Sequence, residues 1–324
     1  MRVLVTGATG SFGKRALRAL LGRGDVEQVV AFSRDEMKQF TLAHDLPAGA
    51  RVRWVLGDVR DQDALVRASR GVDVIIHAAA LKQVVACEMN PLEAIKTNVT
   101  GAANVVAAAL HNRVQRVVSL STDKAVSPVN LYGATKLCAE KLITAAAASA
   151  NDCPTRFSSV RWGNVLGSRG SVVPFFLHRR KTGVLPVTDP RMTRFWITLE
   201  RAVAFVLEVL DVMAGGEVFV PKVPSMNIVD LARAIAPECR VEYIGLRPGE
   251  KLDEMLITLD EARHCLESSI GYIVYSEISP VREYPGMTVR PVAERWEYNS
   301  GTNDAWLSPD DLRGLLASTV VEPY

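Results

Sequence analysis

Short apolar runs alternate with longer segments of mixed polarity along the first half of the chain. The runs cover residues 2–6, 28–32, 52–56, 74–77, 116–120 and 156–161. Runs of this length are typical of strands buried on both faces, and the segments between them have helical spacing. Strands that alternate with helices predict βαβ units. We therefore expect an α/β protein, built as a Rossmann-type doubly wound parallel sheet.

Two of the intervening segments have features beyond their periodicity. The segment from Pro91 to Asn112 is rich in Ala and Val and apolar nearly all round, which predicts one long buried helix. Its Asn98 is expected to form a hydrogen bond near the strand at 116–120. Residues 137–150 are rich in alanine, and such small side chains suit close packing on a second subunit. We therefore expect a homo-oligomer, a dimer or larger.

Glycines follow the first run at a spacing that favours phosphate binding. They form G-x-x-G-x-x-G, and the segment Lys14–Leu21 after them has helical spacing. Glycines let a ligand approach the backbone, and the free N–H groups of a helix N-terminus attract an anion. Strand, glycine turn and helix in this order predict a dinucleotide site. The residues expected to contact the dinucleotide are Gly7, Gly10, Ser11, Phe12 and Gly13.

The end of the second run indicates which dinucleotide is preferred. Sites for NAD usually place an acidic residue there to hold the ribose 2′-hydroxyl. Here Ser33 and Arg34 come first and Lys38 follows. Asp35 and Glu36 suit the first turn of the next helix, where acids are favoured. A hydroxyl and two cations suit a 2′-phosphate, so we expect NADP rather than NAD; a solvated charge cluster is the alternative.

Residues after the third and fourth runs complete the expected cofactor contacts. An aspartate after the third run is placed to reach the adenine edge, and small residues after the fourth would let a cofactor lie against the backbone. This set is Asp58, Val59, Ala78, Ala79 and Lys82. His77, which ends the fourth run, is interpreted as a hydrogen-bonded core residue rather than a general base.

The stretch S-T-D-K-A directly follows the run at 116–120 and carries candidate chemistry. Its Thr122, Asp123 and Lys124 lie just beyond the carboxyl end of a predicted parallel strand. Ligands of open α/β sheets bind at that end of the strands. We therefore expect a hydroxyl, a carboxylate and an amine to face the ligand.

A tyrosine and a lysine follow at helical spacing. Tyr132 and Lys136 are four residues apart, so they share one face of the helix predicted to begin near Tyr132. An ammonium beside a phenol favours the phenolate, so we expect Lys136 to lower the pKa of Tyr132 and make it a base. An ordinary tyrosine with a solvated lysine is the alternative.

After residue 161 the alternation loosens, which predicts a smaller C-terminal substrate-binding lobe. We place the boundary at residue 165. Residues 1–165 would bind NADP and carry the catalytic residues, and 166–324 would mainly bind substrate, with some segments returning to the main sheet. The segment 276–303 contains prolines and a glycine and is expected to be irregular chain.

Arginines in this second lobe are candidates for binding another phosphate group. Arg191 and Arg194 occur in D-P-R-M-T-R-F-W, and Arg247 occurs in R-P-G-E-K. Guanidinium groups bind phosphate through paired hydrogen bonds. Each arginine taken singly is better explained as a surface charge. The expected substrate contacts are Lys82, Asn164, Arg169, Gly170, Ser171, Val172, Thr193, Arg247 and Glu250.

Composition and charge narrow the class of protein. Of the 324 residues, 48% are hydrophobic and 23% charged, and the net charge of +2 favours neither nucleic acid nor a membrane surface as partner. The 5 cysteines show no C-x-x-C spacing, which argues against a disulfide framework or a metal site. No apolar run approaches the ~20 residues of a membrane span. We expect a cytoplasmic protein without a structural metal.

Together the motifs resemble the extended short-chain dehydrogenase/reductase superfamily and, more narrowly, the inverting UDP-N-acetylglucosamine 4,6-dehydratases. The resemblance spans nearly the whole chain and is carried by T-G-A-T-G-S-F-G, S-R-D-E-M-K-Q, A-L-K-Q-V, N-P-L-E-A-I-K-T-N-V, S-T-D-K-A, N-L-Y-G-A-T-K-L, G-S-R-G-S-V-V-P-F-F, R-M-T-R-F-W-I-T, R-P-G-E-K and Y-N-S-G-T-N-D-A-W-L. Two positions depart from the family pattern: Val85 replaces a frequent Pro, and Trp162 a more usual Tyr or Phe.

The resemblance implies a reaction and a role for each residue. Tyr132 would take the proton of the sugar's C4 hydroxyl while hydride passes to NADP+, with Lys136 holding the ribose and Thr122 bonding the C4 oxygen. Lys124 would remove the C5 proton and Asp123 would protonate the departing C6 hydroxyl. Hydride would return to C6, with C5 protonated from the opposite face. From a UDP-N-acetylglucosamine substrate the product would be UDP-2-acetamido-2,6-dideoxy-β-L-arabino-hexos-4-ulose.

Other interpretations stay open at this point. Retaining 4,6-dehydratases carry Asp-Glu where this chain has Asp123 and Lys124. A nucleotide-sugar 4-epimerase needs Tyr132 and Lys136 but no acid and base at 123 and 124. A regulator that senses NADP without catalysis usually lacks the tyrosine or the lysine. Inverting dehydration is therefore the expected activity.

Overall fold

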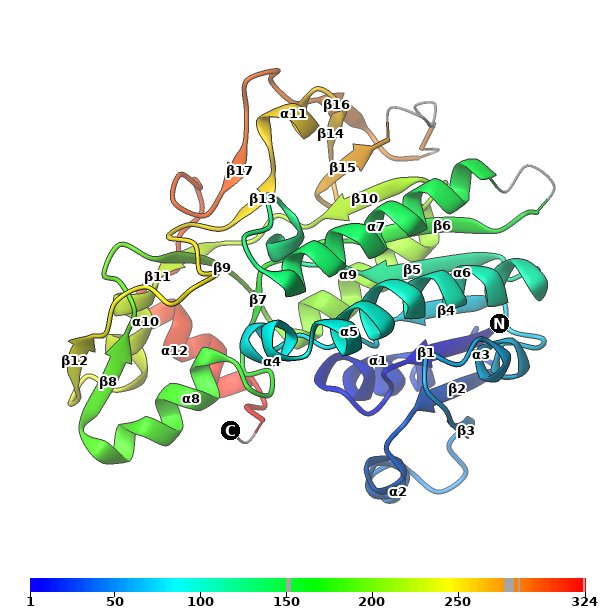
Figure 1. Ribbon diagram of the computed structural model, residues 1–324, viewed down its shortest axis with the longest axis horizontal. Coiled ribbons are helices and arrows are strands. Elements are labelled where there is room, and N and C mark those ends of the chain that lie inside the picture. The colour runs from blue at the N-terminus through cyan, green and yellow to red at the C-terminus, as the bar shows by residue number, and fades with distance from the viewer. Residues whose placement is uncertain (150–152, 277–282, 285, 323) are drawn as a thin grey trace.

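The computed structural model describes residues 1–149, 153–276, 283–284, 286–322 and 324, and a ten-stranded sheet forms its centre (Figure 1). Parallel pairing joins strands in the order β10-β6-β5-β4-β1-β2-β3. Their bounds are β1 Arg2–Thr6, β2 Gln28–Ser33, β3 Val52–Leu56, β4 Val74–His77, β5 Arg116–Leu120, β6 Arg156–Val160 and β10 Glu217–Val220. The chain moves outward from β1 to β3 and then returns to build β4, β5 and β6 on the other side. The predicted doubly wound sheet is confirmed.

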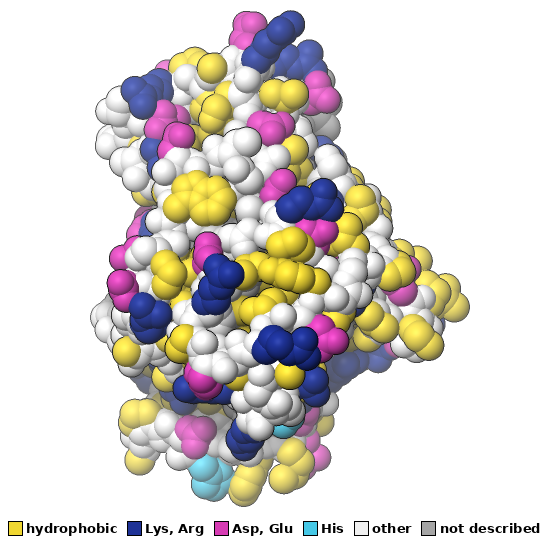
Figure 2. Space-filling model, turned by 90° about the vertical axis from the view of Figure 1, so that its left-hand side faces the viewer, with side chains coloured by type: hydrophobic (Ala, Val, Ile, Leu, Met, Phe, Trp, Pro, Cys, Tyr) yellow, Lys and Arg dark blue, Asp and Glu magenta, His cyan; other side chains and the backbone are white. Residues whose placement is uncertain are grey.

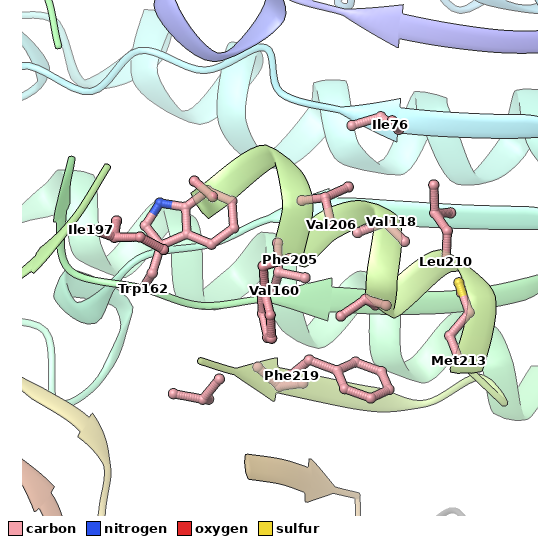
Figure 3. Packing of buried hydrophobic residues seen from close by; sticks show 14 of the residues in the cluster. Ile76, Val118, Val160, Trp162, Ile197, Phe205, Val206, Leu210, Met213 and Phe219 are labelled. Carbon is pink, nitrogen blue, oxygen red and sulfur yellow. The ribbon is translucent and has the colours of Figure 1, made fainter. Parts of the chain in front are cut away.

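Helices cover both faces of this sheet because successive strand residues point to opposite sides. Val3 and Val5 of β1 join the core under α1 and α9, whereas Leu4 joins the core under α3, α6 and α7. Figure 3 shows Phe205 and Val206 of α9 in the first of these cores. The helix bounds are α1 Ser11–Leu21, α2 Glu36–His44, α3 Gln62–Ala68, α6 Gly101–His111, α7 Leu131–Ser149 and α9 Leu199–Val212.

The second half of the chain extends the sheet with antiparallel strands. β15 (Tyr272–Tyr275) pairs with β10, β14 (Cys265–Ser268) pairs with β15, and β16 (Val289–Pro291) completes the edge. Further along, β17 (Tyr298–Asn299) pairs with β13 (Met255–Ile257). The expectation of irregular chain over 276–303 is therefore wrong for β16 and β17; residues 277–282 and 285 lie outside the described residues.

The remaining elements form a smaller lobe at one end of the molecule. Its strands are β7 Asn164–Val165, β8 Val184–Val187, β9 Thr193–Ile197, β11 Ser225–Asn227 and β12 Arg240–Tyr243, and its helices are α8 Val172–Arg179, α10 Ile228–Ile235 and α12 Pro309–Ser318. The short helix α11 (Leu259–Ala262) lies instead beside β14 at the edge of the main sheet (Figure 1). A third core lies between α8, α10 and α12. Figure 2 shows this end with positive and negative side chains interspersed, so no surface of a single charge dominates it.

The predicted helix from Pro91 to Asn112 is one rod with a local defect. It consists of α5 (Pro91–Ile95), a π-helical turn over Lys96–Thr100, and α6, with a short helix α4 (Val84–Met89) before it. The first part is not buried as expected, because Leu92 is 67% exposed. None of the helices within the described ranges is long and apolar enough to cross a bilayer.

Candidate active site

The turn after β1 is shaped for close approach by a ligand. Gly7 has φ +68°, and a Cβ there would lie 2.9 Å from the backbone of Ala79. A Cβ on Gly13 would lie 2.3 Å from the Gly7 carbonyl oxygen. The helix α1 starts at Ser11, and its N-cap Gly10 has no side chain to occupy the first-turn N–H groups. These features fit a pyrophosphate at the helix N-terminus, as predicted.

The residues expected at the 2′-phosphate differ in their surroundings. Ser33 is buried and its hydroxyl accepts a hydrogen bond from Gln39 Nε2 at 2.9 Å. Lys38 Nζ donates to Asp35 Oδ2 at 2.5 Å. Arg34 has a side chain that is 59% exposed, with Nη1 3.8 Å from Asp58 Oδ2. Arg34 is therefore the predicted cation with the most freedom to meet a ligand.

Two other expected cofactor contacts are tied into the fold. Asp58 accepts from Arg60 Nη2 at 2.7 Å, and Val59 is buried with its carbonyl accepting from Asn104 Nδ2 at 3.0 Å. His77 is a core residue, as predicted, with Nδ1 2.8 Å from the Thr6 hydroxyl. Burial lowers the pKa of His77 to about 3, so its ring is neutral.

Thr122, Asp123 and Lys124 lie together at the carboxyl end of β5. A short 3-10 turn spans Asp123–Ala125, and it is held because the Asp123 N–H donates to the Trp162 carbonyl at 3.0 Å. Asp123 Oδ1 accepts from the Thr122 hydroxyl at 2.9 Å and from Lys124 Nζ at 3.0 Å. Asp123 Oδ2 is buried and has no hydrogen-bond partner among the described residues. The predicted cluster therefore exists, and one of its acceptor atoms is unused.

The first turn of α7 packs directly on this cluster. Gly133 follows Tyr132, and a Cβ on Gly133 would lie 2.0 Å from the Lys124 carbonyl oxygen. A glycine at this position therefore allows the helix to approach the strand end. Tyr132 and Lys136 are both buried, as expected of one helix face turned inward.

The direction predicted for the pKa of Tyr132 is wrong for the protein without ligands. Burial raises the pKa of Tyr132 to about 12 and outweighs the Lys124 ammonium and a hydrogen bond with Thr122, which lower it. Burial also lowers the pKa of Lys136 to about 8, with Glu140 opposing the shift. The expectation ignored burial, and the cation that favours the phenolate here is Lys124.

Glu254 is a site residue that the sequence analysis missed. It immediately precedes β13 and is 3% exposed, with Oε1 3.3 Å from Lys124 Nζ. Two further cations face it: Arg194 Nε lies 4.0 Å from Oε1 and Lys251 Nζ lies 3.7 Å from Oε2. Burial opposes the charged amine, but the Asp123 and Glu254 carboxylates raise the pKa of Lys124 above its usual range. No sequence motif identifies Glu254 as a site residue, because its partner Lys124 is far away in the sequence.

Several predicted substrate contacts lie at the seam between the lobes. The Arg169 N–H donates to the Ser11 hydroxyl at 3.3 Å, which brings the loop with Gly170, Ser171 and Val172 to the glycine turn. Asn164 lies in β7, which pairs with β9. Burial lowers the pKa of Lys82, with Glu322 opposing the shift. The contact of Arg169 with Ser11 therefore places this loop beside the predicted cofactor site.

The loop R-P-G-E-K reaches the start of α7. Asn130 Nδ2 donates to the Gly249 carbonyl at 2.9 Å. Within this loop Arg247 and Glu250 pair with each other. Such a surface pair is weak and can open toward a phosphate or a ribose.

Three residues of the D-P-R-M-T-R-F-W segment use their side chains in contacts within the protein. Arg191 pairs with Asp189 at 2.8 Å on the surface. Arg194 is buried and donates to the carbonyls of Leu252 and Lys251. Thr193, predicted to contact substrate, is buried and donates to Asp253 Oδ1 at 2.6 Å. Its hydroxyl therefore supports the segment before Glu254.

Asn98, in the π-helical turn, fastens the loop that carries Lys82. Its Oδ1 accepts from the Leu81 N–H at 2.8 Å, and its Nδ2 donates to the Leu81 carbonyl and to the Thr135 hydroxyl. Asn98 therefore forms its hydrogen bonds with the loop after β4, which is the strand paired with β5, and with α7. No cluster of His, Cys, Asp or Glu suited to a metal occurs in the part of the chain that the structure describes.

Comparisons with known proteins agree on one family. A family model described as "Polysaccharide biosynthesis protein" matches residues 3–275. A protein of Campylobacter jejuni subsp. jejuni named UDP-N-acetylglucosamine 4,6-dehydratase (inverting) is 45% identical over 98% of this chain and 97% of its own. A UDP-glucose 4-epimerase of Rickettsia conorii is 42% identical over 80% of this chain and 78% of its own. The X-ray structure of Pen from Bacillus thuringiensis has a TM-score of 0.91, with 38% identity over 98% of this chain and 97% of its own.

Proposed function

This chain belongs to the polysaccharide biosynthesis protein family, within the extended short-chain dehydrogenase/reductases, and from that premise we propose that it dehydrates UDP-N-acetylglucosamine across C5 and C6 with NADP as cofactor and inversion at C5. The observation that carries the proposal is the contact of the buried Asp123 with the partly buried Lys124, beside the buried Tyr132. This pair would supply an acid and a base for the loss of water from a sugar oxidised at C4.

Tyr132 and Lys136 serve the oxidation at C4. NADP+, when bound, supplies a hydride acceptor at C4 and later a hydride donor at C6. Tyr132 accepts the C4 hydroxyl proton, and the Thr122 hydroxyl turns from Asp123 to donate a hydrogen bond to the C4 oxygen. The raised pKa of Tyr132 keeps the phenol protonated in the absence of ligands, so the Lys124 ammonium is needed to favour the phenolate. Lys136 holds the nicotinamide ribose.

Asp123 and Lys124 serve the elimination. A proton transfer over the 3.0 Å contact from Lys124 Nζ to Asp123 Oδ1 yields an amine and a carboxylic acid. Lys124 then takes the C5 proton, Asp123 protonates the C6 hydroxyl, and water leaves. The pair has returned to an ammonium and a carboxylate, so its proton count balances. Reduction at C6 and protonation of C5 from the opposite face complete the reaction; solvent supplies the C5 proton and receives the one that Tyr132 took from the C4 hydroxyl, so the protons balance.

A 4-epimerase is the second candidate, because the Rickettsia conorii relative carries that name. Epimerisation at C4 requires Tyr132 and Lys136 but gives no task to an acid beside C6. The buried Asp123, with an unused oxygen atom, therefore favours dehydration.

A mass spectrum of the product tests the proposed reaction. Incubation of the protein with UDP-N-acetylglucosamine should give a sugar nucleotide that has lost one water, whereas an epimer has the substrate's mass. Coupling between the ring protons of the product then reports the configuration at C5. An unchanged mass would reject the dehydratase.

The choice of NADP is tested on the purified protein. Denaturation should release NADP(H), and Arg34→Ala should weaken NADP binding by about 2 kcal/mol, the value of a lost charged hydrogen bond, with little effect on NAD. Release of NAD alone would reject the assignment.

A further inference from the structure

The backbone of Glu254 is fixed by a distant part of the second lobe. Its N–H donates to the Ser300 hydroxyl at 2.9 Å, and the Ser300 N–H donates to its carbonyl at 2.8 Å. Thr193 Oγ1 lies 2.7 Å from the same Ser300 hydroxyl. Residues of the lobe expected to bind substrate therefore hold the Glu254 backbone, while its carboxylate contacts Lys124 at the end of β5.

This buried carboxylate is incompletely paired. Its Oε2 has no hydrogen-bond partner among the residues described by the structure, although Lys251 Nζ is 3.7 Å away. Burying a charge without full hydrogen bonding destabilises a fold. A contact of this kind beside a reactive amine therefore suggests a task in the reaction rather than in folding.

We propose that Glu254 is a positioning residue for the dehydration: its carboxylate holds the Lys124 amine at the end of β5 and directs the proton of Lys124 to Asp123. The inference rests on the proposed function, because it assigns a role within that reaction. It adds a residue from the second lobe to the acid and base of the first.

The surroundings of the two carboxylates explain the direction of the proton transfer. Burial opposes ionisation of Glu254, but Lys124, Arg194 and Lys251 lower its pKa below the usual range. Burial raises the pKa of Asp123, with Lys124 opposing the shift. Both carboxylates touch the same ammonium, yet Asp123 is the one that accepts a proton more readily. Glu254 stays charged and becomes the anchor.

The groups that face the Lys124 amine come from four parts of the chain. They are Asp123, Glu254, Arg194 on β9 and Tyr132 on α7. The Glu254 charge raises the proton affinity of both Lys124 and Asp123. Dehydration needs a single proton shared by that pair, which predicts a bell-shaped dependence on pH.

The substitution Glu254→Gln removes the charge and keeps the shape. We expect both limbs of the pH profile for dehydration to move to lower pH by about 1 unit, as for the loss of a neighbouring charge. KM should change little, and transient NADPH absorbance should show that C4 oxidation persists. Glu254→Asp should keep the limbs near those of the parent.

A matched control separates this role from structural damage. Glu217 is also buried, but it bonds Ser158 and the N–H groups of Ala214 and Gly215 in the main sheet. Glu217→Gln should lower stability and leave both limbs in place. Limbs that stay fixed in Glu254→Gln, or move equally in Glu217→Gln, would overturn the proposal.

A second readout needs no substrate and so distinguishes this inference from the proposed function. Lys124 is 25% exposed and can be acylated by acetic anhydride in its amine form. Mass spectrometry should show its acylation half-complete at a pH about 1 unit lower in Glu254→Gln than in the parent. Equal labelling in both proteins would overturn the inference. A shift in labelling without water loss by the parent would uphold the contact and reject the dehydratase.

Discussion

Two largely buried ion clusters in this molecule each hold one cation between two carboxylates. We call them the arginine cluster, Arg161 with Glu140 and Glu261, and the lysine cluster, Lys124 with Asp123 and Glu254. In both, one carboxylate comes from the first half of the chain and the other from the segment 254–261. Their chemistry differs nonetheless.

The arginine cluster is saturated with hydrogen bonds. Arg161 donates to Glu140 Oε1 at 2.5 Å and Oε2 at 3.2 Å, and to Glu261 Oε1 at 2.9 Å and Oε2 at 3.0 Å. Its remaining bond goes to the Leu256 carbonyl at 2.7 Å. A guanidinium keeps its proton, so this cluster can only hold the structure together.

The lysine cluster leaves one oxygen atom of each carboxylate without a hydrogen bond to any residue that the structure describes. An ammonium is a compact donor whose pKa can shift, and its proton can move to a neighbouring carboxylate. The comparison teaches that saturation, more than burial, separates a structural ion cluster from one that can transfer protons.

The largest expected effect comes from breaking the lysine cluster. Lys124→Met and Asp123→Asn should each slow dehydration by about 10²–10⁴-fold, the usual contribution of a general acid or base. Asp123→Asn should still oxidise C4, seen as transient NADPH absorbance, and Lys124→Met should exchange no deuterium at C5. Dehydration within a few-fold of the parent would remove the residue concerned from the mechanism.

Breaking the arginine cluster should instead affect stability. Arg161→Met leaves the buried Glu140 and the partly buried Glu261 without their cation and should lower the free energy of unfolding by about 3–5 kcal/mol. Urea unfolding followed by circular dichroism measures this. Adding Glu140→Gln should recover part of the loss, because one uncompensated charge is removed. A change below about 1 kcal/mol would show that the cluster is not structural.

Lys136 lies one helical turn from Glu140 and lacks such saturation, so it should destabilise the protein without ligands. Its pKa of about 8 is below the usual 10.5 because of burial, so Lys136→Met should raise the free energy of unfolding at pH 7 by about 3 kcal/mol. Between pH 8 and 10.5 the unfolded chain binds the extra proton, so the parent gains stability and the difference should shrink. A constant difference across that window would contradict the shift.

The smallest effect should come from an exposed ion pair. Arg180 pairs with Glu238 on the surface of the second lobe. Arg180→Ala should move the melting temperature by less than about 2 °C, because water and salt screen such pairs. A shift in melting temperature comparable to that of Arg161→Met would mean that burial does not determine how much these ion pairs contribute to stability.

The sequence was sufficient to predict those features that depend on residues close together in the chain. Strand β5, the glycine turn with Gly7 and the four-residue spacing of Tyr132 and Lys136 all follow from neighbours in the chain, and each has its expected place. The resemblance to one family strengthened these predictions, because many motifs occur in the family's order along nearly the whole chain and chance does not produce such an order.

The predictions that were missed or wrong have two causes. Some involve residues that are remote from each other in the sequence, and others involve the effect of burial. Glu254 meets Lys124, and Thr193 turns toward Ser300, through packing that no spacing encodes. The pKa of Tyr132 moved opposite to expectation because a spacing rule counts charges and omits desolvation. The short strands β16 and β17 form only against partners supplied by the rest of the fold.

The anchoring of Glu254 by Ser300 also sets the order in which the protein matures on the ribosome. Lys124 is synthesised early, whereas the residue that fixes its second carboxylate is added roughly 10 s or more later, at about 5–20 residues per second. The dinucleotide fold can form while the chain is still growing, because its strands β1 to β6 are already made. The proposed acid and base gain the support of Glu254 only after Ser300 has been added, so a shorter nascent chain should lack this contact even when it has bound its nucleotide.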